Sequence, residues 1–271
     1  MYSLNKLKRV DSLKYKLVAL DVDGTLLNDD GILTQKTIDT VQKVYKMGVH
    51  VVISTGRSLN QTRPILDELG IEGILISHNG ATTIRTDNKE ILHEFSYDIE
   101  EVADIVKYCR KHDIHFSICT AFEFYIERID AYQTELYKKY HLVPTMHDDV
   151  LGLTEKVMKF TVDDQQKIDG WREIDLKNLR KTSDGFFQDI IHPQAHKASA
   201  LEKVLNKLNI DQSEIIAIGD FYNDIEMLEY AGLGIAMGNA PDDLKAIADV
   251  VTTSNNEDGV CYALENYLLN G

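Results

Sequence analysis

The stretch that decides the fold is Leu17-Val-Ala-Leu-Asp-Val-Asp-Gly-Thr-Leu-Leu27, in which an apolar run ends in two carboxylates. A short, continuous apolar run is typical of a strand that is covered on both faces of a parallel sheet. Open α/β sheets bind ligands at the carboxyl ends of such strands, where Asp21 and Asp23 follow this one. Because like-charged carboxylates repel each other unless a cation lies between them, the stretch predicts a metal site. The alternative is an ordinary turn, since Asp and Gly are favoured turn residues.

Further apolar runs of the same kind recur along the chain, at residues 49–53, 74–76 and 215–218, and residues 249–252 are also strand-like. Apolar side chains at helical spacing lie between and after them, in stretches that begin near Ile38, Leu201 and Val260. This alternation predicts an α/β fold, a doubly wound parallel sheet to which both ends of the chain contribute.

The middle of the chain has a different pattern. Apolar and more polar residues alternate at 122–127 and at 158–163, which is typical of one-sided strands in an antiparallel sheet. A helical stripe at 99–109 is expected to cover the inner face of that sheet. We therefore predict an α+β insert at residues 84–189, a core formed by 16–83 and 190–271, and an N-terminal extension at 1–15. The aromatic cluster of the insert is interpreted as sheet packing, with a substrate platform as the alternative: Phe122, Phe124, Tyr125, Tyr132 and Tyr137.

Composition and charge disfavour several classes of protein. A chain of 271 residues, 44% of them hydrophobic, is long enough for one buried core with a large insertion. The formal net charge of -15 disfavours binding to nucleic acid or to an anionic membrane surface. No stretch without formal charge is longer than residues 73–84, which is too short to cross a bilayer, and the N-terminus lacks the apolar segment of a secretory signal. Three cysteines without CxxC spacing are typical of buried thiols in a reducing compartment, so we expect a cytoplasmic protein.

A second pair of acids follows another apolar run, in Ile215-Ile-Ala-Ile-Gly-Asp-Phe-Tyr-Asn-Asp224. Asp220 comes at the end of the predicted strand and Asp224 in the next turn, at the same sheet edge as Asp21 and Asp23. Carboxylate oxygens that converge there form a hard-oxygen site. Such a site favours Mg²⁺ over Ca²⁺, because Mg²⁺ keeps several waters and accepts substrate phosphate as a ligand. Helix capping by the two aspartates is the alternative.

Two further residues are candidate phosphate ligands, each beside a predicted helix start. Thr55, in Ser54-Thr55-Gly56-Arg57, offers a hydroxyl next to backbone N–H groups, and Lys197 offers a positive charge. Taken singly, Thr55 is more simply explained as a helix-capping or turn hydroxyl, and Lys197 as a solvated surface amine.

Taken together, four motifs resemble the haloacid dehalogenase-like phosphatase superfamily, and specifically its Cof-like branch: Asp21-x-Asp23-Gly24-Thr25, Thr55-Gly56-Arg57, Lys197 and Gly219-Asp220-x-x-Asn223-Asp224. Further stretches are similar to the same branch: Asn79-Gly80-Ala81, Met237-Gly238-Asn239-Ala240 and Asp258-Gly259-Val260. The resemblance covers nearly the whole chain. It implies a Rossmann-like core, an inserted α/β cap and Mg²⁺-dependent hydrolysis of phosphate esters. The chain departs from the branch in the residues before its first strand and in His196, where a small polar residue is more common.

Asp21 is predicted to attack phosphorus and form an aspartyl-phosphate, and Asp23 to act as general acid and then as general base. The predicted Mg²⁺ site consists of Asp21, the backbone carbonyl of Asp23, Asp220 and Asp224, with Asn223 orienting the cluster. The resemblance implies that Thr55 and Lys197 bind the phosphate oxygens. It also implies substrate-binding roles at the rim for Gly56, Arg57, Asn79 and Asn239.

The expected partner is a small-molecule phosphate ester, with sugar phosphates as the leading class and cofactor phosphates such as flavin mononucleotide or pyridoxal phosphate next. The insert is expected to close over the substrate and to select the leaving group. The alternatives are a phosphomutase, a phosphoryl-accepting receiver module and a non-catalytic phospholigand-binding protein. His192 and His196 are interpreted as loop or surface residues rather than as half of a zinc site. No partner protein is implied.

Overall fold

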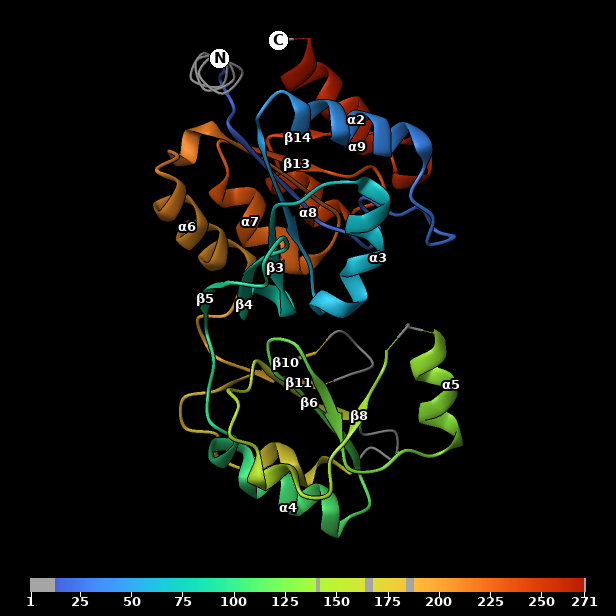
Figure 1. Cartoon of the computed structure of the whole chain (residues 1–271), viewed down its shortest axis with the longest axis vertical. Coiled ribbons are helices and arrows are strands. Elements are labelled where there is room, and N and C mark those ends of the chain that lie inside the picture. Colours follow the sequence, from blue (N-terminus) through green and yellow to red (C-terminus); the bar gives the residue numbers. More distant parts are fainter. Residues whose placement is uncertain (1–12, 140–141, 164–167, 184–187, 271) are drawn as a thin grey trace. The chain divides into compact units, whose positions relative to one another are not determined.

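The computed structural model describes residues 13–139, 142–163, 168–183 and 188–270, so most of the predicted N-terminal extension lies outside the described residues. The chain forms two compact units (Figure 1). The core unit consists of Met1–Arg57, Thr62–His93 and His196–Gly271, and the insert unit of Ser58–Gln61 and Glu94–Ala195. Among the helices of the described residues, none combines the length and apolar character that crossing a membrane requires.

An eight-stranded sheet in the order β14-β13-β12-β1-β2-β3-β4-β5 forms the centre of the core unit. From β14 to β3 all neighbouring strands are parallel, and β4 is antiparallel to β3. The strands are β1 (Leu17–Leu20), β2 (His50–Ser54), β3 (Ile74–Ser77), β4 (Thr82–Arg85), β5 (Ile91–Glu94), β12 (Ile215–Gly219), β13 (Leu233–Ala236) and β14 (Val250–Val251). The predicted doubly wound α/β fold is confirmed.

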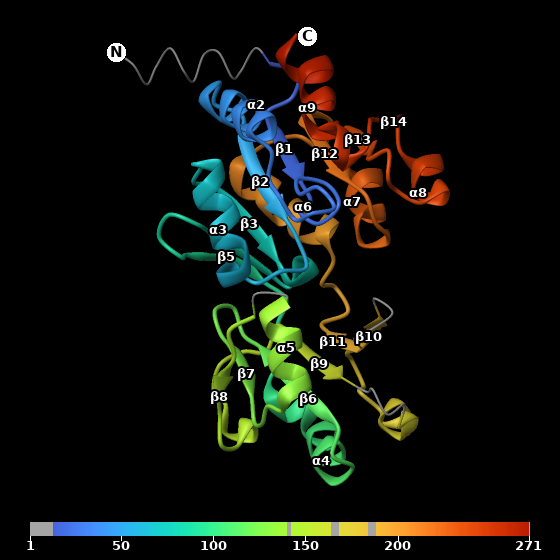
Figure 2. The same cartoon turned by 90° about the vertical axis from the view of Figure 1, so that its right-hand side faces the viewer.

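Helices cover both faces of this sheet. On one face, Leu17 and Ala19 pack in a cluster with side chains of α6, α7 and α8. Val18 and Leu20 point to the other face and are equally buried. Helices α2 and α9 lie side by side (Figure 1, Figure 2). The helices are α2 (Gln35–Lys46), α3 (Leu59–Leu69), α6 (Lys197–Leu208), α7 (Ile225–Tyr230), α8 (Asp242–Ile247) and α9 (Gly259–Leu264), which continues into a π-helical turn at Glu265–Leu269.

The register of the central strands decides where the site forms. Leu20, the last residue of β1, pairs with Ile218 of β12 on one side and with Ile53 of β2 on the other. Because these strands are parallel and end together, the residues that follow them emerge at one edge of the sheet.

The insert unit has a six-stranded sheet in the order β10-β11-β9-β6-β7-β8, antiparallel except for the pair of β7 and β8. One sheet face packs on α4 around the fully buried Trp171 and Phe160, as the alternation predicted. The elements are α4 (Ala103–Lys111), β6 (His115–Cys119), β7 (Phe124–Ile126), α5 (Ala131–Lys139), β8 (Thr145–Met146), β9 (Lys159–Asp163), β10 (Arg180–Ser183) and β11 (Gln188–Ile191).

The boundaries of the insert unit in the structure differ from the predicted ones, which were residues 84 and 189. Strands β4 and β5 belong to the eight-stranded sheet, because Thr82–Arg85 pairs with β3. The main segment of the insert unit accordingly runs from Glu94 to Ala195.

The aromatic residues of the insert unit have mixed environments. Phe124 packs edge-on against Tyr137, with ring centroids 5.3 Å apart, and Tyr125 packs against the buried cluster around Trp171. Tyr132 remains 44% exposed. The packing interpretation therefore holds for Tyr137, Phe124 and Tyr125. The cysteines Cys109, Cys119 and Cys261 are buried free thiols, as predicted.

His115 makes the stability of the protein dependent on pH. Its Nε2 lies 2.5 Å from the Tyr137 hydroxyl, and burial lowers its pKa from 6.5 to about 4, with Arg128 adding to the effect and Asp130 opposing it. The folded state therefore keeps this imidazole neutral, whereas the unfolded chain takes up a proton as the pH falls below 6.5. The contribution of neutral His115 is fully present above the unfolded pKa and is lost as the pH falls.

We expect this group alone to cost about 2 kcal/mol of unfolding free energy by pH 5. The check is denaturant unfolding between pH 7 and pH 5, in which His115→Gln should lose correspondingly less stability than the wild type. Equal losses in the two proteins would contradict the prediction.

Candidate active site

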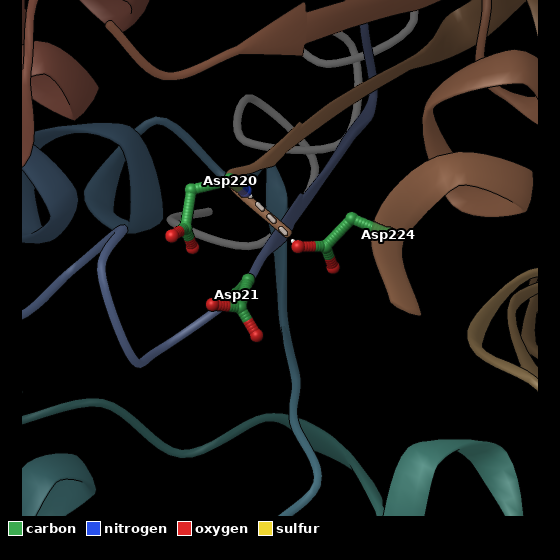
Figure 3. Close-up of side chains that lie close together, drawn as sticks. All are labelled: Asp21, Asp220 and Asp224. Atoms are coloured by element: carbon green, nitrogen blue, oxygen red, sulfur yellow. Dashed lines mark hydrogen bonds between the residues drawn. The ribbon is translucent and has the colours of Figure 1, made fainter. Parts of the chain in front are cut away.

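Three aspartate side chains meet at the carboxyl edge of the core sheet. Asp21 follows β1, Asp220 follows β12, and Asp224 lies in the short 3₁₀ turn Tyr222–Asp224. One carboxylate oxygen from each lies within 4.8 Å of the others (Figure 3). The structure thus brings Asp21 of the first acid pair together with both acids of the second pair, Asp220 and Asp224.

Glycines next to these aspartates leave the space that the carboxylates occupy. Gly24 has φ +76°, and a Cβ built there would lie 2.2 Å from Oδ2 of Asp220. A Cβ on Gly219 would lie 2.4 Å from Cγ of Asp224. Oδ2 of Asp224 also accepts hydrogen bonds from the backbone N–H groups of Asp220 (3.0 Å; dashed line in Figure 3) and Phe221 (3.1 Å). The loop that holds Asp220 is therefore fixed by Asp224 itself.

Lys197, the first residue of α6, is buried within this cluster. Its Nζ donates to Oδ1 of Asp21 at 2.5 Å and to Oδ1 of Asp224 at 2.6 Å, and the residue is only 1% exposed. The sequence alone left a solvated surface amine as an alternative, which the structure contradicts. His196 caps the same helix, since its Nδ1 accepts from the backbone N–H of Ser199 at 3.2 Å.

Burial dominates the electrostatics of the cluster. It raises the pKa of Asp21 to about 8, against the opposing effect of Lys197, and the Asp224 charge raises it further. Burial also raises the pKa of Asp220 to about 6, although the hydrogen bond from Thr25 lowers it. With all three acids ionised, the one ammonium of Lys197 balances only one of the three charges. A divalent cation would balance the remainder, and a donor set of carboxylate oxygens is the kind that Mg²⁺ prefers. The residues therefore fit this metal.

Asp23 has a different environment from Asp21, although only one residue separates them. Its side chain is 62% exposed and forms a two-pronged ion pair with Arg57, whose Nε lies 2.9 Å from Oδ2 and whose terminal nitrogen lies 2.6 Å from Oδ1. Arg57 was predicted to bind substrate; in this structure its guanidinium binds Asp23.

A network of hydrogen bonds connects the Thr55 loop to the loop of the second acid pair. Oγ1 of the buried Thr55 accepts from the backbone N–H of Arg57 at 3.2 Å, and the Thr55 carbonyl accepts from the N–H of Asn79 at 3.0 Å. The Asn79 side chain in turn accepts from Nδ2 of Asn223 at 3.0 Å. Gly56 lies against Asn79, because a Cβ there would approach its Oδ1 to 3.1 Å. Asn79 and Asn223 thus bind each other.

Asn239 and Thr25 hold Asp220 from the other side. Nδ2 of Asn239 donates to the Gly24 carbonyl at 2.9 Å and to Oδ2 of Asp220 at 3.3 Å. Oγ1 of Thr25 donates to Oδ1 of Asp220 at 2.9 Å, a role that the sequence reasoning missed although Thr25 stood in its first motif. Its place directly after Asp-x-Asp-Gly was the available signal.

The two histidines near α6 have separate roles. His196 is the helix cap described above, and His192 stacks on Phe95 with ring centroids 5.6 Å apart. Among the residues that the structure describes, neither belongs to a group of side chains with metal-binding geometry.

A family model described as haloacid dehalogenase-like hydrolase matches residues 18–264, nearly the whole chain. The chain belongs to the haloacid dehalogenase-like hydrolase family. The resemblance seen in the sequence is thereby confirmed, and so is the expectation of a hydrolase.

Curated members of the haloacid dehalogenase-like family and solved structures agree with this assignment. The chain is 32% identical over 275 residues to the putative phosphatase YxeH of Bacillus subtilis (strain 168), covering 94% of this chain and 99% of the relative. It is 30% identical over 260 residues to 5-amino-6-(5-phospho-D-ribitylamino)uracil phosphatase YcsE of the same organism, covering 96% and 98%. A crystal structure of a haloacid dehalogenase-like hydrolase from Bacteroides thetaiotaomicron superposes with a TM-score of 0.82 at 27% identity, covering 93% of this chain and 99% of that one.

Proposed function

We propose that this protein is a Mg²⁺-dependent phosphatase that hydrolyses small-molecule phosphate monoesters through an aspartyl-phosphate. The observation that carries the proposal is the buried cluster of Asp21, Asp220 and Asp224 around the ammonium of Lys197. Such a cluster has a nucleophile, oxygen ligands for a cation and a positive charge for phosphate within one small volume.

Asp21 is the proposed nucleophile. One of its carboxylate oxygens forms the bond to phosphorus while the bond from phosphorus to the ester oxygen breaks, and water later hydrolyses the acyl phosphate. Lys197 favours the ionised, nucleophilic form of Asp21, because its ammonium lies 2.5 Å from Oδ1. Burial raises the pKa of Asp21 to about 8 even beside Lys197, so further positive charge is needed to keep the carboxylate ionised at neutral pH, and a bound Mg²⁺ would supply it.

Asp23 is the proposed general acid and base. It delivers a proton to the leaving ester oxygen and then takes one from the attacking water. Both of its carboxylate oxygens accept from Arg57, so Asp23 has to leave this partner before either oxygen can face the ester. Thr55 and Lys197 are proposed to bind the phosphate oxygens, with Gly56, Arg57, Asn79 and Asn239 at the rim.

The carboxylates of Asp21, Asp220 and Asp224 and the backbone carbonyl of Asp23 are the proposed Mg²⁺ ligands, with Asn223 orienting the cluster. When bound, Mg²⁺ supplies positive charge that offsets the charge of the phosphoryl group and of its carboxylate ligands. The insert is proposed to act as the cap that selects the leaving group.

The proposed substrates are esters of sugars and sugar alcohols, followed by cofactor phosphates. The name of the relative YcsE describes a phosphorylated sugar alcohol, a ribityl chain attached to a uracil ring. A phosphomutase would use the same acids, but it would return the phosphoryl group to the substrate instead of releasing it. The protein is proposed to act in the cytoplasm.

The test is release of inorganic phosphate from p-nitrophenyl phosphate and a panel of sugar and cofactor phosphates, with Mg²⁺ and after chelation. We expect turnover with Mg²⁺ that is lost after chelation and restored by added metal. Chromatography of the products separates hydrolysis, which yields the free alcohol, from a mutase reaction, which yields an isomeric phosphate. The absence of turnover on every ester would overturn the proposal.

A further inference from the structure

The side-chain amide of Asn239 connects the loops that follow four neighbouring strands of the core sheet. Asn239 itself follows β13, and its Nδ2 donates to the Gly24 carbonyl after β1 (2.9 Å) and to Oδ2 of Asp220 after β12 (3.3 Å). Its Oδ1 accepts from the backbone N–H of Asn255, which follows β14 (3.0 Å). These strands are adjacent in the order β14-β13-β12-β1, so a single amide spans four strand ends.

The partners of this amide fix its orientation. A backbone N–H can only donate, so the atom that faces the N–H of Asn255 is the amide oxygen. Nδ2 then faces the Gly24 carbonyl and the Asp220 carboxylate, one acceptor for each of its two hydrogens. A phosphate oxygen would have to displace one of these acceptors before it could bind the amide. A place at the rim therefore does not by itself make Asn239 a donor to substrate.

Backbone contacts hold the loop that carries Asn239. The N–H of Gly238 donates to the Thr253 carbonyl at 3.0 Å. A Cβ on Gly238 would lie 2.7 Å from the backbone nitrogen of Ser254, so the two loops pack backbone against backbone. The amide of Asn239 is thus attached to a restrained main chain, which a residue that positions others requires.

Asp220 differs from the other two carboxylates of the cluster in the groups that hold it. The other two accept from the ammonium of Lys197, whereas Asp220 accepts from neutral side chains. Oγ1 of Thr25 donates to its Oδ1 and Nδ2 of Asn239 donates to its Oδ2. Neutral donors orient a carboxylate but leave its charge to be balanced by a cation.

We infer that Asn239 is a positioning residue of the proposed Mg²⁺ site, which directs the Asp220 carboxylate toward the metal and does not donate to the substrate. This inference rests on the proposed function and assigns a residue of the rim to the metal instead of the phosphate ester. Gly24 directly follows Asp23, so the bond from Asn239 also restrains the loop that carries the proposed backbone ligand. Removing a hydrogen-bond partner of a metal ligand typically weakens metal binding by about 10- to 100-fold.

The test is Mg²⁺ binding to the metal-free protein without substrate, measured by titration calorimetry. Asn239→Leu keeps a side chain of similar size and shape but lacks the amide. We expect its dissociation constant for Mg²⁺ to be at least about tenfold higher than that of the wild type. The rise in unfolding temperature on adding Mg²⁺ should be smaller in the variant, because a more weakly bound ligand stabilises the folded state less.

Two further variants separate positioning from a general loss of structure. Asn239→Ser keeps a polar group at this exposed position but is too short to span both acceptors, so it should also bind Mg²⁺ weakly. Asn256→Leu is the matched control, because this exposed amide is bonded through both its oxygen and its nitrogen to Asp29, outside the carboxylate cluster. It should leave Mg²⁺ affinity unchanged. Each protein is compared with itself with and without metal, which cancels differences in intrinsic stability.

Kinetics with p-nitrophenyl phosphate distinguish the positioning role from substrate binding. At saturating Mg²⁺, KM of Asn239→Leu should stay within about twofold of the wild type, whereas the Mg²⁺ concentration for half-maximal rate should rise at least about tenfold. A raised KM with unchanged Mg²⁺ affinity would overturn the inference, because Asn239 would then contact the substrate.

The inference and the proposed function fail in different ways. Equal Mg²⁺ affinity in Asn239→Leu and the wild type would reject the positioning role and leave the phosphatase function intact. If the wild type hydrolyses no ester, the proposed function fails, and the calorimetric comparison still decides the role of Asn239. A wild type that binds no Mg²⁺ would overturn the inference together with the proposed metal dependence.

Discussion

Replacing Asp21 by asparagine is expected to lower kcat for every hydrolysed phosphate ester by at least about 10⁴-fold. The amide keeps the shape of the side chain but cannot form the acyl phosphate. Because the carboxamide can still accept a hydrogen bond from Lys197, we expect the variant to stay folded. The measurement is single-turnover and steady-state phosphate release, with the circular dichroism spectrum recorded alongside.

Asp39→Asn is the matched control, an exposed aspartate on α2 of the same unit. It should retain wild-type kcat, because it lies outside the carboxylate cluster. If Asp21→Asn kept more than about a tenth of the wild-type rate, Asp21 could not be the nucleophile.

Replacing Lys197 by methionine is expected to destabilise the protein by about 3–5 kcal/mol in metal-free buffer, and to abolish turnover. The methionine fills a similar volume, but it leaves the carboxylates of Asp21 and Asp224 buried without their cation. Guanidinium unfolding measures the loss. Adding Asp224→Asn to Lys197→Met should recover part of it, because the double variant buries one charge fewer.

Lys203→Met on the same helix is the control for the loss of a lysine. Its side chain is 41% exposed and its Nζ lies 4.0 Å from the nearest oxygen of Glu202, so its removal should change stability by no more than about 0.5 kcal/mol. Similar unfolding midpoints for Lys197→Met and the wild type would show that the buried ion pairs contribute little.

The sequence predicted the arrangement of the core because each step followed from local patterns. Continuous apolar runs predicted parallel strands, and the acids at their ends predicted a common edge. The pairing of Leu20 with both Ile218 and Ile53 then places Asp21 beside the loop of Asp220, as the doubly wound pattern requires.

The pairings within the site could not be predicted in the same way, because their partners come from distant parts of the chain. Nothing in the local sequence of Lys197 distinguishes a buried ammonium from a solvated one; its burial depends on Asp21, which belongs to another strand. The same holds for Arg57, whose guanidinium was free to reach either a substrate or Asp23. The predicted boundary at residue 84 divided the strand Thr82–Arg85 and left β5 in the insert, because an antiparallel edge strand of the core resembles one of the insert in its sequence pattern.

The pairing of β1 with β12 has a consequence for the order of folding. Leu17 pairs with Ile215, so during synthesis one edge of β1 stays open until the whole insert has left the ribosome. The insert unit has its own buried cluster, formed within residues 97–190, so it can become compact before β12 is made. The core sheet is then completed late in synthesis, when β12 pairs with the distant strand β1. Only at that moment does Asp21 acquire Lys197 and the second acid pair as neighbours.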